Sequence, residues 1–413
     1  MNVLVVSSKY PPEFSGSGLR AHQTYQRLHQ KFGIESEVIA SGIEFPVRER
    51  YTEDDVSVER IVSPQARNLV SKTARTPLSR LTNSLMFHTE ARAVRGALAE
   101  RDFDLIHVFG YSPATVAAIL WSRKHGVPLM LELVNMVASP YLYLPGTRRF
   151  SGYDLANQCV IVAISEELER RSQKAGLTDN VWTRPNPVDV SRYAPVSDDR
   201  RSEVRSRLGS FGGGDKLIVY VAKFIGRKNH SFLIDVLKHL PGNFKLVLAG
   251  PPHVESDSIS GVTLSQMPEL ETKARVLGVA ERLTITPDVV DHAEYLSASD
   301  VSCFPSEDEA MGTPLLEAIA AGVPVVANAG EPSFQQWITN AENGFLEPLD
   351  AEKWAKSIIA ASEMSVPQRL KMSADINDQI STEVIDQQYK LLLDRLVEST
   401  PDEAINVNAT LNS

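Results

Sequence analysis

The sequence has very little cysteine and no long uninterrupted apolar segment. Among its 413 residues only Cys159 and Cys303 are cysteines, too few for a disulfide framework or a structural zinc site. No segment approaches the roughly 18 to 20 consecutive apolar residues that a membrane-spanning helix requires. These two absences predict a cytoplasmic protein that does not cross a membrane.

The chain also has fewer basic residues than acidic ones, 42 against 52. The formal net charge is −10 at pH 7, which argues against nucleic-acid binding as the main function. Hydrophobic residues make up 43% and charged residues 23% of the chain, proportions typical of a folded protein with a large core. The length favours two or three domains over one.

What the sequence does contain is an alternation of short apolar, β-branched runs with longer helical stretches. Runs that are apolar almost throughout are typical of parallel strands buried on both faces. The pattern occurs twice, once before and once after Arg184-Pro185-Asn186-Pro187, with strands expected at 3–6, 36–40, 104–109, 128–133, 159–165, 216–222, 244–250, 282–286, 301–304 and 323–328. It predicts an α/β fold of two Rossmann-like, doubly wound parallel-sheet domains with a cleft between them at the carboxyl ends of the strands.

The domain boundaries follow from the same pattern. We expect a first domain over 1–185, a second over 186–380, and a helix over 381–398. The two proline-flanked bonds and the polar stretch 196–215, which contains three consecutive glycines, predict a linker between the halves. The polar tail 399–413 has the composition of a disordered segment.

The most specific chemical pattern is the segment 305–318, PSEDEAMGTPLLEA. It follows an expected strand, and Pro314 suits the first turn of a helix, where its missing N–H costs nothing. Backbone N–H groups around Gly312 would present a partial positive charge to an anion at this helix start.

Two carboxylates flank this helix start. Glu309 and Glu317 have seven residues between them, and carboxylates accept hydrogen bonds from sugar hydroxyls. An anion site between two hydroxyl-binding groups matches the shape of a sugar nucleotide. The competing interpretation is a solvated turn acid followed by an ordinary helix acid.

A second pattern is a basic loop between a strand and a helix. Lys223 and Lys228 lie five positions apart in a loop that contains Gly226, a placement suited to neutralising a diphosphate. A solvated basic loop is the alternative. The position of the loop at the start of the second half favours a functional role.

A glycine-containing loop follows the first expected strand. Gly16 and Gly18 would let backbone N–H groups approach a phosphate or an acceptor. The glycines come about nine residues after the strand, and the second strand closes on Ala40-Ser41-Gly42 without an acidic residue. Both features argue against a dinucleotide-binding fingerprint and hydride transfer.

Two further features carry weaker signals. His107, near the carboxyl end of a strand, is a candidate for the cleft, although a lone histidine is more often structural. The adjacent acids Glu307, Asp308 and Glu309 resemble a metal-binding Asp-x-Asp. Three neighbours on a turn point in different directions, and the lysines offer another charge partner, so we expect no metal.

The segment 67–101 reverses the acidic sign of the chain, with seven basic residues against Glu90 and Glu100. Leucines, a methionine and a phenylalanine are interleaved with these basic residues. This composition suits contact with anionic lipid or a lipid-linked acceptor at the inner face of a membrane. A solvated helical face is the competing interpretation.

These motifs together resemble a retaining glycosyltransferase of family 4, with the GT-B fold, also called glycosyltransferase group 1. The resemblance extends from Gly16 to Gly344 and rests most specifically on the segment from Pro305 to Asn328, which contains Glu309 and Glu317. It implies that the first domain binds the acceptor, that the second binds a nucleotide-sugar donor, and that the helix 381–398 crosses back to the first domain.

The resemblance also assigns site residues. It implies that Glu309 contacts the donor sugar, that Glu317 holds the ribose hydroxyls, and that Lys228 and Lys223 bind the diphosphate. His107 would be a catalytic residue, and Val289 and Val290 would lie near the base. The segment of Met311, Gly312, Thr313, Pro314 and Leu315 would bind the sugar and the diphosphate through its backbone N–H groups. Pro314 has no N–H and would belong to the site only as part of this segment.

The reaction expected from the resemblance is metal-independent transfer of a sugar, with retained configuration, from a UDP- or GDP-sugar to an acceptor hydroxyl. The acceptor would be a glycan, a lipid-linked molecule or a small glycoside in glycoconjugate synthesis. Two alternatives stay open: a GT-B sugar-nucleotide epimerase or phosphorylase, and a non-catalytic sugar-nucleotide-binding protein. The donor sugar, the base and the oligomeric state cannot be read from the residues.

Overall fold

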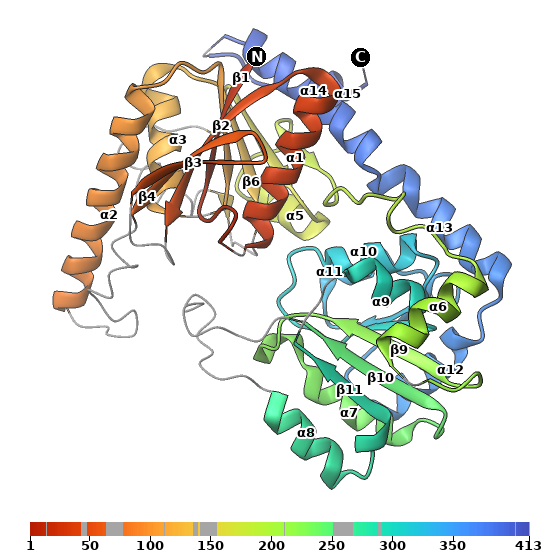
Figure 1. Ribbon diagram of the computed structural model, residues 1–413. Coiled ribbons are helices and arrows are strands. Elements are labelled where there is room, and N and C mark those ends of the chain that lie inside the picture. Colours follow the sequence, from red (N-terminus) through yellow and green to blue (C-terminus); the bar gives the residue numbers. More distant parts are fainter. Residues whose placement is uncertain are drawn as a thin grey trace. The chain divides into compact units, whose positions relative to one another are not determined.

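A computed structural model provides the structure of the chain. It describes residues 1–13, 15–42, 48–62, 77–110, 112–134, 139–140, 155–209, 211–250, 267–287, 291–400 and 402–412, and for residues 42, 62 and 77–87 the backbone alone. The chain forms two compact units (Figure 1). Unit 1 comprises Met1–Arg184 together with Ile385–Ser413, and unit 2 comprises Pro185–Val384.

Unit 1 is built on an eight-stranded sheet in the order β3-β4-β2-β1-β5-β6-β7-β8. All neighbouring strands are parallel except β3 and β4, which are antiparallel. The strands are β1 (Asn2–Ser7), β2 (Glu35–Gly42), β3 (Glu49–Glu53), β4 (Val56–Val62), β5 (Leu105–Phe109), β6 (Leu129–Leu133), β7 (Cys159–Ala163) and β8 (Val181–Thr183).

Helices cover this sheet and explain why its strands are apolar throughout. One core joins Val3 and Val5 of β1 to α1 (Gly16–Phe32) and to α14 (Thr382–Glu398). The helices α2 (Pro77–Ala99) and α3 (Pro113–His125) contact each other, and α3 also contacts β1 and β5 (Figure 1). Among the described residues of the unit, the remaining helices are α5 (Glu166–Lys174) and α15 (Val407–Leu411).

Unit 2 contains a six-stranded, fully parallel sheet in the order β11-β10-β9-β12-β13-β14. Its strands are β9 (Lys216–Val221), β10 (Phe244–Ala249), β11 (Leu283–Thr286), β12 (Val301–Phe304), β13 (Val325–Asn328) and β14 (Gly344–Glu347). The helices that the structure describes in this unit are α6 (Asp198–Leu208), α7 (His230–His239), α8 (Met267–Val276), α9 (His292–Ala298), α10 (Thr313–Ala320), α11 (Pro332–Gln335), α12 (Ala351–Ser362) and α13 (Val366–Ile380), with short 3-10 turns η3 (Gly226–Lys228) and η4 (Ala280–Arg282).

The two-sheet α/β architecture predicted from the sequence is confirmed, and each expected strand is present within two residues of its expected ends. Sequence reasoning missed β3, β4, β8 and β14. The hairpin between β3 and β4 turns at Asp54 and Asp55, which both adopt positive φ angles (42° and 67°). Those two aspartates are the signal that identifies a tight turn.

The linker expected over 196–215 is wrong. This stretch contains α6, which lies wholly in unit 2, whereas the chain passes between the units at Arg184 and Pro185. Only Val204 of α6 is buried, so the helix has no apolar stripe that a sequence pattern would reveal.

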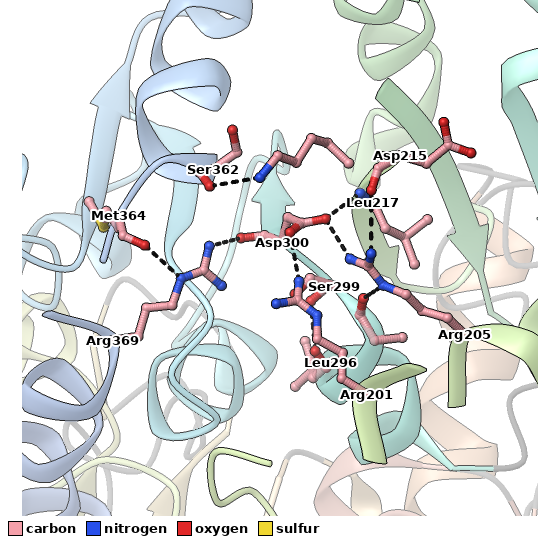
Figure 2. Close-up of polar contacts among 12 residues, drawn as sticks. Arg201, Arg205, Asp215, Leu217, Leu296, Ser299, Asp300, Ser362, Met364 and Arg369 are labelled. Atoms are coloured by element: carbon pink, nitrogen blue, oxygen red, sulfur yellow. Dashed lines mark hydrogen bonds and ion pairs between the residues drawn. The ribbon is translucent and has the colours of Figure 1, made fainter. Parts of the chain in front are cut away.

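Arginine contacts hold α6 in place instead (Figure 2). Arg201 and Arg205 donate to the two carboxylate oxygens of Asp300, at 2.7 and 2.6 Å. Asp300 also accepts from the Leu217 N–H at 2.7 Å, and its carbonyl accepts from Arg369 of α13 at 3.1 Å. One buried aspartate therefore joins α6, α13 and the amino ends of β9 and β12.

The disordered tail expected over 399–413 is also wrong for the residues that the structure describes there. The tail forms α15, and Ile405 and Val407 are buried in the core of unit 1. The Val407 N–H donates to the Asp179 carbonyl at 2.7 Å. A few apolar residues of this polar segment pack against the core, a signal too sparse for composition to detect.

The basic stretch 67–101 is described only in part, because residues 67–76 and the side chains of 77–87 lie outside the described portion. Arg101 is committed to ion pairs with Glu37 and Glu59, at 3.0 and 2.6 Å. Within the described portion, no helix has both the length and the apolar character needed to cross a membrane. Contact of this stretch with lipid stays a prediction.

Asp300→Asn should destabilise unit 2. The change removes the charge that compensates Arg201 and Arg205, and leaves two largely buried guanidinium groups without an anion. We expect the free energy of unfolding to fall by about 3 to 4 kcal/mol, the low part of the range for breaking a buried pair, because both arginines keep some water contact. Urea unfolding measures the change. Asp378→Asn, an exposed change on α13, is the control, and equal stability of both variants would contradict the role of Asp300.

Candidate functional site

Two loops that are far apart in the sequence meet at the carboxyl edge of the unit 2 sheet. One loop follows β9 and the other follows β12, and these strands are parallel neighbours, with Ile218 paired to Val301. The backbones of the loops are joined directly, because the Glu307 N–H donates to the Arg227 carbonyl at 2.9 Å. The strand order therefore places the predicted lysine loop beside the predicted acidic segment.

An ion pair between Lys228 and Glu309 connects the two loops. Arg227 adds a second cation, its Nη1 lying 3.4 Å from Oε1 of Glu309. Burial alone would raise the pKa of the Glu309 carboxyl, but Lys228 and Arg227 outweigh it and hold that pKa below its ordinary value. Glu309 is therefore a charged carboxylate, 8% exposed, with two cations beside it.

Aromatic residues pack beside the lysine loop and support it. The Tyr220 hydroxyl donates to the Lys228 carbonyl at 3.1 Å. The His230 ring stacks on Phe224, with centroids 4.6 Å apart, and lies 4.9 Å from the Tyr220 ring. Burial lowers the pKa of His230 to about 3, so this histidine is neutral and packs as an aromatic group under the loop.

Two polar side chains hold the acidic loop, and sequence reasoning missed both. Glu331 is buried and accepts from the Glu309 N–H at 3.0 Å. Asn328 donates to the Ser306 carbonyl at 3.2 Å. Asn328 ends the expected strand 323–328 and Glu331 follows it by three residues. That position is the signal that would have found them, because side chains at the carboxyl ends of parallel strands collect at one edge.

Helix α10 begins at Thr313, as the proline and glycine pattern predicts. Gly312 has a φ of 75°, and a Cβ there would lie 2.4 Å from the Phe334 ring, so only glycine fits. The Leu315 N–H already donates to the Gly312 carbonyl at 2.9 Å. This bond narrows the expected group of anion-binding N–H donors to the residues before Leu315.

The side chains of the acidic segment diverge. Glu307 and Asp308 are exposed, whereas Glu309 is buried against Lys228. Among the described residues, no three histidine, cysteine, aspartate or glutamate side chains form a group that could hold a metal ion. Independence from metal stays a prediction for the reaction itself.

The structure places other predicted residues without testing their roles. Lys223 lies two residues after β9 and is half-buried. Val289 and Val290 lie outside the described residues. In unit 1, Gly16 and Gly18 occupy the first turn of α1, and a Cβ on Gly18 would lie 2.3 Å from the Lys9 carbonyl oxygen. A close backbone approach therefore requires the glycine at position 18.

His107 lies in β5 with a fully buried side chain. Its Nδ1 is 2.8 Å from the Tyr25 hydroxyl and its Nε2 is 3.5 Å from Oε1 of Glu132. Burial, reinforced by Arg184, lowers the pKa of His107 despite the opposing effect of Glu132. These contacts favour the structural interpretation of His107, and its part in the reaction stays a prediction.

Family models match the chain in two consecutive segments. The model described as Glycosyltransferase Family 4 matches residues 14–192, and the model described as Glycosyl transferases group 1 matches residues 204–378. The chain belongs to the family 4 glycosyltransferases. The second match contains Lys228, Glu309 and Glu317, so these site residues lie in the part of the chain that the group 1 model matches.

Several curated glycosyltransferases are similar to this chain. A Bacillus subtilis protein named as the teichuronic acid biosynthesis glycosyltransferase TuaC is 26% identical over 338 residues, 79% of this chain and 80% of TuaC. The phosphatidyl-myo-inositol mannosyltransferase of Mycobacterium tuberculosis is 26% identical over 67% of this chain and 68% of its own length. The D-inositol 3-phosphate glycosyltransferase of Xylanimonas cellulosilytica is 30% identical, over 55% of this chain and 56% of its own.

Solved GT-B glycosyltransferases share the fold of this family 4 member. HepE from Anabaena, solved with UDP and glucose, has a TM-score of 0.67 at 20% identity and covers 95% of this chain and 99% of HepE. Sucrose-phosphate synthase from Thermosynechococcus elongatus has a TM-score of 0.73 at 17% identity, covering 96% and 98%. The GT-B fold predicted from the sequence is confirmed.

The glycosyltransferase has one more carboxylate at this edge, Glu317 of α10. Its Oε2 lies 2.5 Å from Nδ1 of His292 at the start of α9. At Thr313, the first residue of α10, the side-chain hydroxyl accepts a hydrogen bond from the Asn186 amide at 2.6 Å. Neither His292 nor Asn186 was assigned to the site from the sequence, because each lies in a separate loop.

Lys228→Ala should lower stability more at pH 8 than at pH 5. In the wild type the depressed pKa keeps Glu309 charged at both values, so its contribution is lost only at lower pH. In the variant, burial favours the neutral form, and protonation at pH 5 relieves the uncompensated charge. We expect a loss of about 1 to 3 kcal/mol at pH 8 and a smaller loss at pH 5, measured by urea unfolding.

The matched control is Lys238→Ala, which removes an exposed lysine at the end of α7. It should leave unfolding unchanged at both pH values. A Lys228→Ala loss that is the same at pH 5 and pH 8 would contradict the electrostatic coupling to Glu309.

Proposed function

We propose that this glycosyltransferase is metal-independent and retaining, and moves a sugar from a nucleoside-diphosphate sugar to an acceptor hydroxyl. The observation that carries the proposal is the ion pair between Lys228 and Glu309, in which Glu309 belongs to the loop that leads into α10. It combines a cation for phosphate, a carboxylate for sugar hydroxyls and a helix N-terminus within one edge of unit 2.

In the proposed reaction, the bond from the anomeric carbon to the diphosphate oxygen breaks as the bond to the acceptor oxygen forms. The acceptor proton passes to the departing phosphate oxygen on the same face of the sugar. Negative charge then grows on the diphosphate, where Lys228 and Lys223 act as preorganised cations. No protein nucleophile is required.

The Lys228–Glu309 pair gives the site a defined state before donor binds. Each charge compensates the other, so neither is left uncompensated in a largely buried position. A bound diphosphate shares Lys228, and the Glu309 carboxylate then accepts hydrogen bonds from the donor sugar. Arg227, 43% exposed, is an additional cation for the leaving diphosphate beyond the two lysines predicted from the sequence.

The comparisons support a choice of first substrates. HepE was solved with UDP, with UDP-glucose, and with UDP and glucose, so a UDP-sugar is the proposed donor class to test before GDP- and ADP-sugars. The relatives named for teichuronic acid and for phosphatidyl-myo-inositol support a glycan or lipid-linked acceptor. Glu317 would bind the ribose hydroxyls of the donor.

A panel of UDP-, GDP- and ADP-sugars, each with and without EDTA, tests the donor site. A ligand at about 100 times its dissociation constant should stabilise the protein by about 2.7 kcal/mol. We expect one nucleotide series to raise the melting temperature equally with and without EDTA. Stabilisation that requires a divalent metal would overturn the metal-independent mechanism, and failure of every nucleotide would favour a different ligand class.

Turnover of the stabilising donor tests the catalytic assignment. Lys228→Ala should lower turnover by about 100- to 1,000-fold, the range for loss of one oxyanion-type donor, whereas Lys238→Ala should leave it unchanged. NMR of the product should show the anomeric configuration of the donor. A loss below tenfold in a folded variant, or an inverted product, would contradict the mechanism, and nucleotide binding without any transfer would favour a non-catalytic binding protein.

A further inference from the structure

Glu317 is surrounded by polar side chains from two other segments of unit 2. The Nδ1 atom of His292 lies 2.5 Å from Oε2 of Glu317, and the two side chains are 16% and 17% exposed. The buried Tyr193 lies near the same carboxylate: burial, together with the charge of Glu317, raises the pKa of Tyr193. The rings of Tyr193 and His292 meet edge to face, with centroids 5.8 Å apart.

Local structure fixes both neighbours of Glu317. Asp189 accepts from the N–H groups of Ser191 and Arg192, at 3.1 and 3.2 Å, and so closes the turn that presents Tyr193. Asp291 caps α9 by accepting from the Ala293 N–H at 2.9 Å. Arg192 donates to Asp291 at 2.9 Å, which ties the turn to the start of α9.

This arrangement limits the conformations of Glu317. A glutamate on a helix surface ordinarily samples several rotamers, and each contact must offset the entropy lost in fixing it. Here His292 on an adjacent helix contacts the carboxylate, and Tyr193 on an adjacent turn packs against that histidine. A carboxylate has about four lone-pair positions, so these neighbours leave acceptor positions available for a diol.

We propose that His292 and Tyr193 are positioning residues that orient Glu317 toward the two ribose hydroxyls and thereby set a preference for ribonucleotides over deoxyribonucleotides. This inference rests on the proposed function, which assigns the ribose to Glu317. A nucleotide that lacks one hydroxyl leaves an oriented, largely buried carboxylate short of a donor, and such a site rejects the analogue. A freely rotating carboxylate would lose less.

Binding of ribo- and deoxyribonucleotides tests the proposal. The probes are UDP, GDP or ADP, whichever stabilises the wild type most, and its 2′-deoxy and 3′-deoxy forms, measured by calorimetry. For the wild type we expect binding of the ribonucleotide about 10- to 100-fold tighter than of at least one deoxy form. His292→Ala should weaken ribonucleotide binding about 3- to 10-fold and leave the dissociation constants of the deoxy forms unchanged.

Three further variants separate positioning from a general structural effect. Tyr193→Phe removes only the hydroxyl and should reduce the ribo-to-deoxy ratio in the same way as His292→Ala. His292→Gln keeps a donor near Glu317 and should retain part of the ratio. His239→Ala, an exposed histidine at the end of α7, should retain all of it, and melting temperatures verify that each variant is folded.

The outcomes distinguish this inference from the proposed function. If Glu317→Ala loses the ribo-to-deoxy ratio while His292→Ala and Tyr193→Phe keep it, the positioning role is overturned and the ribose site stands. If His292→Ala weakens ribo- and deoxyribonucleotides equally, its effect is general and the inference is also overturned. If the wild type does not discriminate, or Glu317→Ala keeps the ratio, the assignment of ribose to Glu317 in the proposed function fails.

Discussion

The site depends on the parallel pairing of β9 with β12. Parallel neighbours end at the same edge of a sheet, so the loops that follow them must meet there. Lys228 and Glu309 are separated by 81 positions in the chain, yet this pairing makes them direct partners. The other contacts of the site extend from that edge: Tyr220 supports the lysine loop, Glu331 holds the Glu309 backbone, and helix α10 begins immediately afterwards.

Each edge of the unit 2 sheet has a group of paired charges, and the two groups have different roles. At the amino edge, the carboxylate of Asp300 is saturated by Arg201, Arg205 and a backbone N–H, and the arginines are further bound to backbone carbonyls (Figure 2). That cluster holds elements together. At the carboxyl edge, Lys228 and Glu309 compensate each other at a similar degree of burial, and in the proposed reaction a bound diphosphate shares Lys228. The same chemistry of paired ions therefore attaches elements at one edge and, in the proposed function, binds the donor at the other.

Unit 1 illustrates why histidine roles are hard to assign from sequence. A histidine near the end of a strand suggests a cleft residue, although a lone histidine is more often structural. The structure instead surrounds His107 with Tyr25 and Glu132, and Glu132 is itself paired with Arg184 and Tyr389. Tyr389 belongs to α14, the helix that returns to this unit. Whether a histidine near a strand end is exposed therefore depends on side chains from a helix that is distant in the sequence, here Tyr389 of α14.

The sequence by itself determined the α/β class, the positions of the ten expected strands, the α10 start and the candidate residues Lys228, Glu309 and Glu317. Each of these is encoded locally, by an apolar run, a proline after a glycine, or a charge at a fixed spacing. Only the tertiary structure decided that Arg227 joins the Lys228–Glu309 pair, that His292 and Tyr193 meet Glu317, and that Asp300 anchors α6. Those contacts depend on strand order and helix placement, and no local periodicity records which distant segments become neighbours.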